Sequence, residues 1–229
     1  MEFKIDIKIF LVGLIFFIVN QFYMYILFMI FVIIHECFHL LAGIVLGYKV
    51  KNLKIMPLGV SVGFKEKEEE YNTKIRKSNM NNVKKIIILL MGPISNIVIA
   101  GMFLVLNKPE PVYINIVIAI FNLLPIYPLD GGQILNRILR IFYSNFESYK
   151  ISNSINNIMM SILTALASIV LLYTKNIAII FIVIFMWYLI IKENIKYKEM
   201  SNILNLFTIW TKKLIIMYNS YVKGAKIYG

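Results

Sequence analysis

The two histidines of this chain lie four residues apart, in the stretch His35-Glu36-Cys37-Phe38-His39. Residues i and i+4 share one face of a helix, so both imidazoles can bind the same metal ion. The Glu36 carboxylate, next to the first imidazole, can then take a proton from water that the metal activates. The spacing therefore predicts a hydrolytic zinc site. The packing of two histidines beside a salt-bridged glutamate is the simpler alternative.

The motif lies inside an apolar run from Phe10 to Leu46, and further apolar runs follow along the chain. Of the 229 residues, 59% are hydrophobic and 16% are charged. A soluble globular domain carries less apolar and more charged sequence, so this composition excludes that class. We expect an all-α polytopic membrane protein whose helices are long enough to cross a hydrocarbon core of roughly 30 Å.

The pattern of apolar and polar stretches predicts six transmembrane helices. Alternating residues 53–64, within a polar stretch from 48 to 82, predict a short β-rich segment after the second helix. Two prolines, Pro125 and Pro128, predict that the fourth helix is broken near its end, because proline interrupts the helical hydrogen-bond ladder. We expect a polar connection near 144–154. The expected helices cover residues 4–20, 22–47, 83–106, 112–129, 155–174 and 176–191.

The net charge of +12 is distributed as expected for a membrane protein. All but two of the lysines and arginines, Lys108 and Lys175, fall on one side of the six-helix arrangement, which places both termini in the cytoplasm by the positive-inside rule. Topology explains this charge better than a nucleic-acid ligand does. We expect a six-helix domain over residues 1–193 and a basic amphipathic tail over 194–229, without a nucleotide-binding CBS domain. The tail could lie on the bilayer or dock a partner.

Only two of the twelve acidic residues fall in or against apolar segments, and these are Glu36 and Asp130. A carboxylate within a bilayer is costly unless it is paired, protonated or metal-bound, so both carboxylates are functional candidates. Along their helices, His39 and Asp130 reach similar depths, about 24 and 27 Å from the outer ends. Two imidazoles, one carboxylate and an open position form a hydrolytic zinc arrangement. For Asp130, an N-terminal helix cap is the competing role.

Three motifs together resemble the site-2 protease family of intramembrane zinc metalloproteases. They are the histidine motif, residues 92–96 (Gly-Pro-Ile-Ser-Asn) and residues 122–132, from Asn122 to the Asp-Gly-Gly sequence. The resemblance implies one Zn²⁺ held by His35, His39 and Asp130, with Glu36 as the catalytic base. Within the family, the motifs are most similar to those of stage IV sporulation protein FB, a protease that activates a membrane-tethered sigma-factor precursor. That likeness implies a pro-sigma substrate and membrane regulatory proteins as partners. Phe38 departs from the small residue that many relatives carry.

Two asparagines are further candidates for substrate binding or for stabilising the oxyanion. Asn122 precedes the break in the fourth helix, and Asn96 follows the Gly92-Pro93 pair. Hydrogen bonding between helices is the alternative role for both amides. Gly92-Pro93 itself is most simply a kink that permits close helix approach. The 53–64 stretch could offer a strand edge to an unwound substrate, or it could be an ordinary surface hairpin.

Taken together, these features predict a metalloendopeptidase that cleaves a membrane-associated substrate by regulated intramembrane proteolysis. A metal-binding transporter or a non-catalytic scaffold would hold the same ion without chemistry. A zinc-dependent hydrolase acting on lipid is a second alternative, and it would need no strand edge for a peptide. Replacement of Glu36 by Gln separates the catalytic from the non-catalytic classes.

Overall fold

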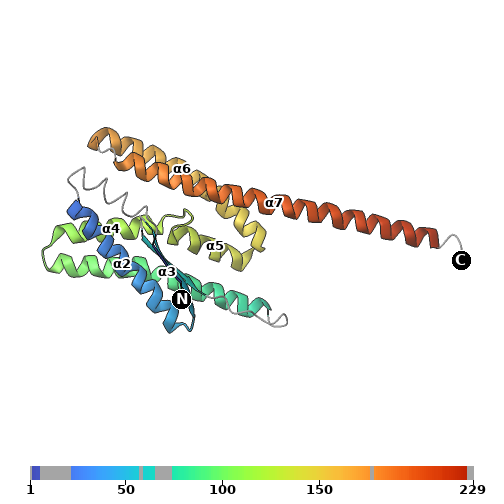
Figure 1. Ribbon diagram of the computed structural model, residues 1–229, viewed down its shortest axis with the longest axis horizontal. Helices are drawn as coiled ribbons and strands as arrows, with labels where there is room; N and C mark the ends of the chain where they lie inside the picture. The colour runs from blue at the N-terminus through green and yellow to red at the C-terminus, as the bar shows by residue number, and fades with distance from the viewer. Residues whose placement is uncertain (1, 6–21, 57–58, 65–73, 176–177, 226–229) are drawn as a thin grey trace. The chain divides into compact units, whose positions relative to one another are not determined.

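The computed structural model describes residues 2–5, 22–56, 59–64, 74–175 and 178–225 (Figure 1). The chain divides into two compact units, Met1–Ser148 and Tyr149–Gly229, and each is described by itself. The elements are, in order, β1 (Glu2–Ile5), α2 (Phe22–Val45), β2 (Val50–Met56), β3 (Gly59–Phe64), α3 (Lys74–Val105), α4 (Pro109–Leu123), α5 (Asp130–Phe142), α6 (Asn145–Thr174) and α7 (Ala178–Ala225).

Three apolar helices, α2, α3 and α4, pack together in the first unit. Phe31 and Val32 of α2 form a buried cluster with Ile118 of α4. The ring of Phe103 on α3 lies 5.8 Å from that of Phe31 in an edge-to-face arrangement. Such aromatic pairs add packing energy beyond the area they bury. This cluster fixes α2, the helix that carries both histidines, against its neighbours.

The C-terminus of α2 has a specific stop signal at Gly47. Gly47 has a φ of +80°, a conformation that glycine adopts without steric cost. Its N–H donates to the carbonyl of Ile44 at 2.9 Å, and the N–H of Tyr48 donates to that of Gly43 at 2.9 Å. These two bonds form a Schellman motif, which satisfies the last helical carbonyls and turns the chain into β2.

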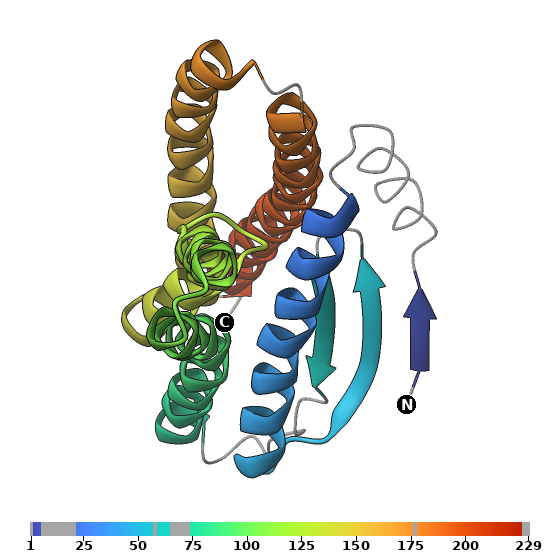
Figure 2. The same cartoon turned by 90° about the vertical axis from the view of Figure 1, so that its left-hand side faces the viewer.

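A three-stranded sheet follows this turn, in the order β1-β2-β3. β1 pairs with β2 in parallel, and β2 pairs with β3 antiparallel. Figure 2 shows α2 lying beside the β2–β3 pair, with which it is in contact. The two strands β2 and β3 occupy the stretch where alternation predicted strands. The helix predicted from residue 4 does not begin there, because Lys4 and Ile5 belong to β1, and residues 6–20 lie outside the described residues.

The break predicted in the fourth helix is present. α4 ends at Leu123, and α5 begins at Asp130, so residues 124–129 leave the helical path where Pro125 and Pro128 lie. With 15 residues, α4 is about 22 Å long, shorter than a hydrocarbon core of roughly 30 Å. The short helix α5 follows the break.

The predicted count of six membrane spans is not supported. Among the described residues, three helices are long and apolar enough to cross a membrane, namely Phe22–Val45, Asn79–Val105 and Asn145–Thr174. α4 is too short, because it ends at Leu123, just before Pro125 and Pro128. In α7 the apolar stretch 178–191 is followed directly by Lys192 and Glu193, so the described part of that stretch is short as well.

The polar connection predicted near 144–154 is helical instead, because α6 begins at Asn145. The N–H of Glu147 donates to Ser144 Oγ at 3.2 Å, while the Glu147 carboxylate accepts from the Ser144 hydroxyl at 3.1 Å and from its N–H at 3.4 Å. This reciprocal pair is a capping box, which satisfies exposed donors at a helix start. The sequence Ser-x-x-Glu at residues 144–147 is the signature of this motif.

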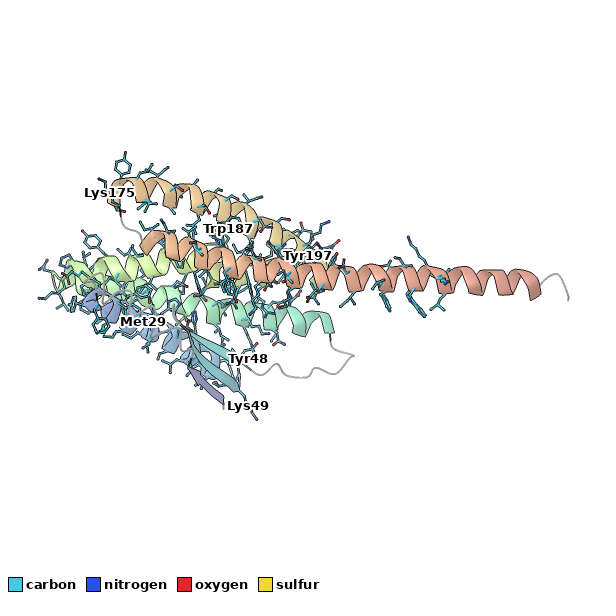
Figure 3. All side chains as sticks on the ribbon, turned by 45° about the horizontal axis from the view of Figure 1, so that its top comes forward. Met29, Tyr48, Lys49, Lys175, Trp187 and Tyr197 are labelled. Carbon is cyan, nitrogen blue, oxygen red and sulfur yellow. The ribbon has the colours of Figure 1, made fainter. Side chains whose placement is uncertain are left out.

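In the second unit, polar side chains join α6 and α7. Figure 3 labels two of the α7 residues concerned, Trp187 and Tyr197. The Trp187 indole N–H donates to Thr164 Oγ1 at 3.0 Å, and Asn194 Nδ2 donates to Asn157 Oδ1 at 3.0 Å. The Tyr149 ring lies 5.7 Å from that of Tyr197. α7 also continues without interruption to Ala225, through the boundary predicted at residues 193 and 194. The physical reason is that no proline and no glycine before Gly224 interrupts it.

Candidate metal centre

The two histidines of α2 lie on one buried face of the helix. His35 is 2% exposed and His39 is 5% exposed. Their Nε2 atoms are 3.1 Å apart, and the ring planes are nearly perpendicular, at 87°. Two imidazole nitrogens that face each other across this distance, away from water, form one side of an ion site.

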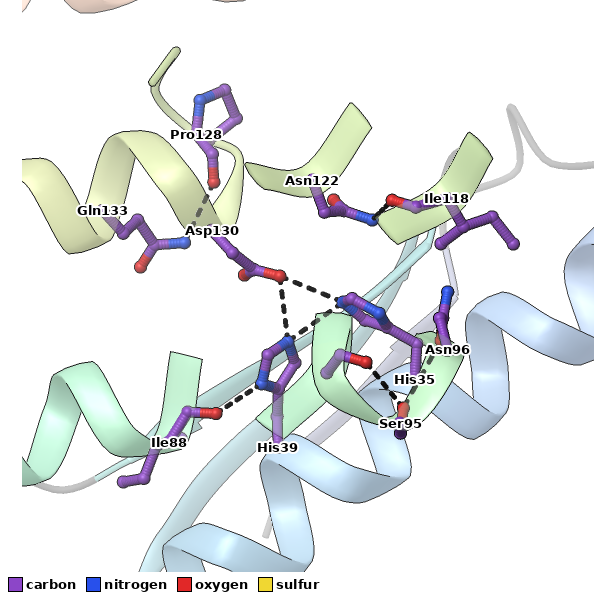
Figure 4. A network of polar contacts seen from close by, with 11 residues as sticks. His35, His39, Ile88, Ser95, Asn96, Ile118, Asn122, Pro128, Asp130 and Gln133 are labelled. Carbon is purple, nitrogen blue, oxygen red and sulfur yellow. Dashed lines mark hydrogen bonds and ion pairs between the residues drawn. The ribbon is translucent and has the colours of Figure 1, made fainter. Parts of the chain in front are cut away.

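Asp130 completes this site from another element. Its Oδ2 lies 3.0 Å from His35 Nε2 and 3.1 Å from His39 Nε2 (Figure 4). Tetrahedral zinc with bonds of about 2.0–2.1 Å holds neighbouring donor atoms about 3.3 Å apart. The triangle of two nitrogens and one oxygen therefore fits one face of a zinc tetrahedron. Among the described residues, His35, His39 and Asp130 are the group able to hold a metal ion.

The first residue of α5 is Asp130, and the residue in the N-cap position is Leu129. The competing role of Asp130 as a helix cap is therefore not observed, because its carboxylate points to the imidazoles. Gly131 and Gly132 allow this placement. A Cβ on Gly131 would collide with the backbone of Leu123, and one on Gly132 would collide with the backbone at Ile126. The start of α5 thus packs flat against the preceding loop.

A hydrogen bond to the main chain of α3 fixes the orientation of His39. Its Nδ1 lies 2.7 Å from the carbonyl oxygen of Ile88. A carbonyl oxygen only accepts, so Nδ1 carries the proton and Nε2 of the neutral ring keeps its lone pair for a metal. Partners of this kind orient metal-binding histidines in many proteins.

Gly92, also on α3, forms the wall of the site opposite the histidines. A Cβ built at this position would overlap Nε2 of His35 and of His39. The Gly92 carbonyl accepts a 2.6 Å hydrogen bond from the Ser95 hydroxyl. The close approach of another helix that was predicted at Gly92-Pro93 is thus present, and the groups that approach Gly92 are the two imidazoles of α2.

Glu36 lies next to the triangle without being part of it. It is partly exposed on α2, and its carboxylate interacts electrostatically with His39 and Asp130. The structure thus brings Glu36 close to the three possible ligands.

Both candidate asparagines lie around the site in Figure 4. Asn96 is fully buried on α3, where its Oδ1 accepts from the Ser95 hydroxyl at 3.4 Å. Its Nδ2 has no hydrogen-bond partner in the described part of the chain. Asn122 is partly exposed in the last turn of α4, and its Nδ2 donates to the carbonyl of Ile118 at 3.1 Å. The two Nδ2 groups therefore differ, since only that of Asn122 donates a hydrogen bond within its own helix.

The sequence is similar to those of known proteins. The sequence profile of Peptidase family M50 matches residues 23–108 and 111–166. A zinc metalloprotease of Methanocaldococcus jannaschii is 29% identical over 170 residues, which cover 72% of this chain and 47% of that protein. This chain thus spans about half the length of that relative.

The fold is also shared with a solved structure. The site-2 protease from Methanocaldococcus jannaschii superposes with a TM-score of 0.62 at 20% sequence identity, covering 84% of this chain and 91% of the other. The matched ranges of the family profile include the histidine motif, helix α3 and Asp130. Because that match extends over more than half of the residues, the chain belongs to peptidase family M50, the site-2 protease family.

Proposed function

We propose that this protein is an intramembrane zinc metalloprotease that hydrolyses a peptide bond of a membrane-associated protein. The observation that carries the proposal is the convergence of His35 Nε2, His39 Nε2 and Asp130 Oδ2 within 3.0–3.1 Å of one another, beside Glu36. Family membership and the zinc metalloprotease relative both support it. The donor set, two imidazoles and one carboxylate, is typical of hydrolytic zinc sites.

The residues of the site have two roles, metal binding and proton transfer. His35, His39 and Asp130 would hold the ion. When bound, zinc supplies a Lewis acid that polarises a carbonyl oxygen and acidifies water. Glu36 would accept a proton from the attacking water and deliver it to the leaving amine, because its carboxylate lies beside the ligands and supplies none of the three donor atoms.

Asn96 and Asn122 are proposed as groups that bind the substrate backbone or the developing oxyanion. The buried Nδ2 of Asn96 supports this role, because a donor without a partner in the described residues is costly unless something else accepts from it. For Asn122 to donate to substrate, its amide would have to leave the carbonyl of Ile118. Asn96 is therefore the better supported of the two.

The substrate is proposed to be a membrane-tethered protein, cleaved by regulated intramembrane proteolysis. The motif likeness to stage IV sporulation protein FB supports a sigma-factor precursor in sporulation, with membrane regulatory proteins as partners. The distribution of lysine and arginine supports a multi-pass protein with both termini in the cytoplasm. A protease domain over 1–193 and a tail over 194–229 remain the proposed division of function.

Cleavage by Glu36→Gln, measured together with zinc content, tests the proposal. We expect the purified variant to retain zinc and to lose cleavage of a tethered sigma-factor precursor by about 10²–10⁴-fold. Glu110→Gln is the matched control, because Glu110 is exposed in the first turn of α4. A wild-type protein without zinc, or a variant that cleaves normally, would contradict the mechanism. Assays with an unrelated transmembrane peptide and with lipid vesicles separate a general protease and a lipid hydrolase from the sporulation enzyme.

A further inference from the structure

The C-terminal half of α7 presents a large apolar surface that the protease mechanism does not use. Seven large apolar side chains between residues 203 and 215 are each at least 55% exposed. In α3, a candidate membrane span, Ile97 and Met102 are 56% and 62% exposed. The exposed fractions of these tail side chains are thus as large as those of apolar side chains on α3, a helix long and apolar enough to span a membrane. The seven residues are Ile203, Leu206, Phe207, Ile209, Trp210, Leu214 and Ile215.

Helix α6 cannot cover this surface by pairing alongside it. The ring pair Tyr149–Tyr197 places the N-terminal part of α6 beside residue 197 of α7. α6 begins at Asn145, only four residues before Tyr149, so it can cover about one further turn of α7. The exposed apolar residues begin beyond that turn.

Five of the seven apolar residues form one stripe. With 100° between successive residues, Ile203, Leu206, Phe207, Trp210 and Leu214 fall within an arc of about 100°. This arc is wide enough for an amphipathic helix that lies on a membrane surface. Tryptophan is also enriched where a protein meets the headgroup region of a bilayer.

The polar side of the same segment carries positive charge only. Lys212 and Lys213 are exposed, and Lys213 borders the apolar stripe. No aspartate or glutamate occurs from residue 200 to residue 229, whereas this stretch contains four lysines. A cationic face beside an apolar stripe is complementary to the surface of an anionic bilayer, with apolar side chains in the acyl region and ammonium groups at the phosphates.

We propose that residues 200–215 of α7 bind in the plane of an anionic lipid bilayer, and that the protein uses this segment as a second membrane attachment. A pairing of two tails fits less well, because each copy would bring lysines without any acidic residue of the same stretch to oppose them. α7 is one uninterrupted helix in the structure, so in-plane binding at a bilayer implies that it bends within the charged stretch 192–199.

The two tryptophans of the chain allow a direct test in full-length protein. Trp187→Phe leaves Trp210 as the only indole, and the reciprocal Trp210→Phe leaves Trp187. Each variant is reconstituted in vesicles of phosphatidylcholine alone or with phosphatidylglycerol, and the emission is quenched by lipids brominated near the headgroup or by acrylamide in water. Trp187 serves as the reference indole, because it lies in the apolar stretch of α7 and bonds to Thr164.

We expect Trp210 to be quenched by brominated lipid and shielded from acrylamide in phosphatidylglycerol vesicles. Lys212→Glu with Lys213→Glu should reduce the lipid quenching of Trp210 by more than about half, since charge attraction becomes repulsion. Lys108→Glu with Lys175→Glu changes the net charge equally outside the tail and should leave it unaffected. Full acrylamide access in every vesicle overturns the proposal. Shielding that depends on protein density and not on lipid charge also overturns it, in favour of a second copy.

Discussion

His39 Nδ1 donates a 2.7 Å hydrogen bond to the carbonyl oxygen of Ile88, one helical turn before Gly92 on α3. This bond and the missing side chain of Gly92 act on the same imidazole from one helix. The first fixes the ring, and the second leaves room at its Nε2 atom. α3 therefore shapes the metal centre without contributing a ligand.

Gly92→Ala is expected to abolish stable zinc binding, because the new methyl group would occupy the space of both Nε2 atoms. We expect zinc retention to fall at least tenfold, as for other changes that misplace metal ligands, and cleavage to fall with it. Elemental analysis of purified protein measures the metal directly. Gly101→Ala is the control, since nothing lies within 4 Å of a Cβ there and α3 should gain stability of up to about 1 kcal/mol. Equal zinc content in both variants would contradict the observed geometry.

Gly131→Ala should weaken zinc binding through Asp130 alone. The added methyl would press on the carbonyls of Leu123 and Leu124 and push the first turn of α5 away from α2. We expect a decrease in zinc affinity of about 10–100-fold, measured by competition with a chelator of known affinity. Ile138→Ala, at an exposed position of the same helix, should leave the affinity unchanged. An unaltered zinc affinity in Gly131→Ala would contradict this prediction, because the backbone at Leu123 and Leu124 would then have moved to make room for the methyl group.

Removal of the metal by a strong chelator should abolish cleavage, and one equivalent of Zn²⁺ should restore it. Mg²⁺ should not, because it prefers octahedral oxygen coordination over two imidazoles and one carboxylate. The assay is cleavage of the reconstituted substrate before and after metal addition. Cleavage that persists in protein shown to be metal-free would exclude a zinc mechanism.

Ser144→Ala should destabilise the start of α6 without changing cleavage. The variant loses the hydroxyl that accepts from the Glu147 N–H, and such caps contribute about 1 kcal/mol. Hydrogen exchange of the amides at 145–148 should accelerate several-fold. Ser161→Ala provides the comparison, because the Ser161 hydroxyl bonds to the Asn157 carbonyl inside the helix and caps nothing. The same exchange rates in both variants would exclude the capping box.

The sequence was sufficient to predict which side chains meet at the site. The spacing of His35 and His39 matches one helical turn, and Asp130 stands out because an acidic residue beside an apolar segment is rare. The long-range contact between these residues agrees with the similar depths predicted along two apolar helices that cross the membrane in the same direction. The sequence did not reveal the role of the Ile88 main-chain carbonyl or of the missing side chain at Gly92. Only three-dimensional packing brings these two positions to the imidazoles.

The helix boundaries were harder to predict than the site. Residues 145–154 are polar, so hydropathy assigned them to a connection, yet the Ser144–Glu147 capping box starts α6 there. In the same way, the charged residues after 191 marked the end of an apolar stretch but not the end of α7. Hydropathy reports where a chain is apolar, whereas hydrogen bonding and the absence of proline decide where a helix ends.

The placement of Asp130 in the first turn of α5 makes the bound metal a cross-link in the chain. It would join positions 35 and 130, which are 95 residues apart. A cross-link that closes a loop of that size lowers the conformational entropy of the unfolded chain, which is also how a disulfide acts. A metal held by both ends of the loop therefore favours the folded state. The loss of zinc would then loosen strands β2 and β3 and helices α3 and α4, which lie within this loop, as well as the catalytic centre.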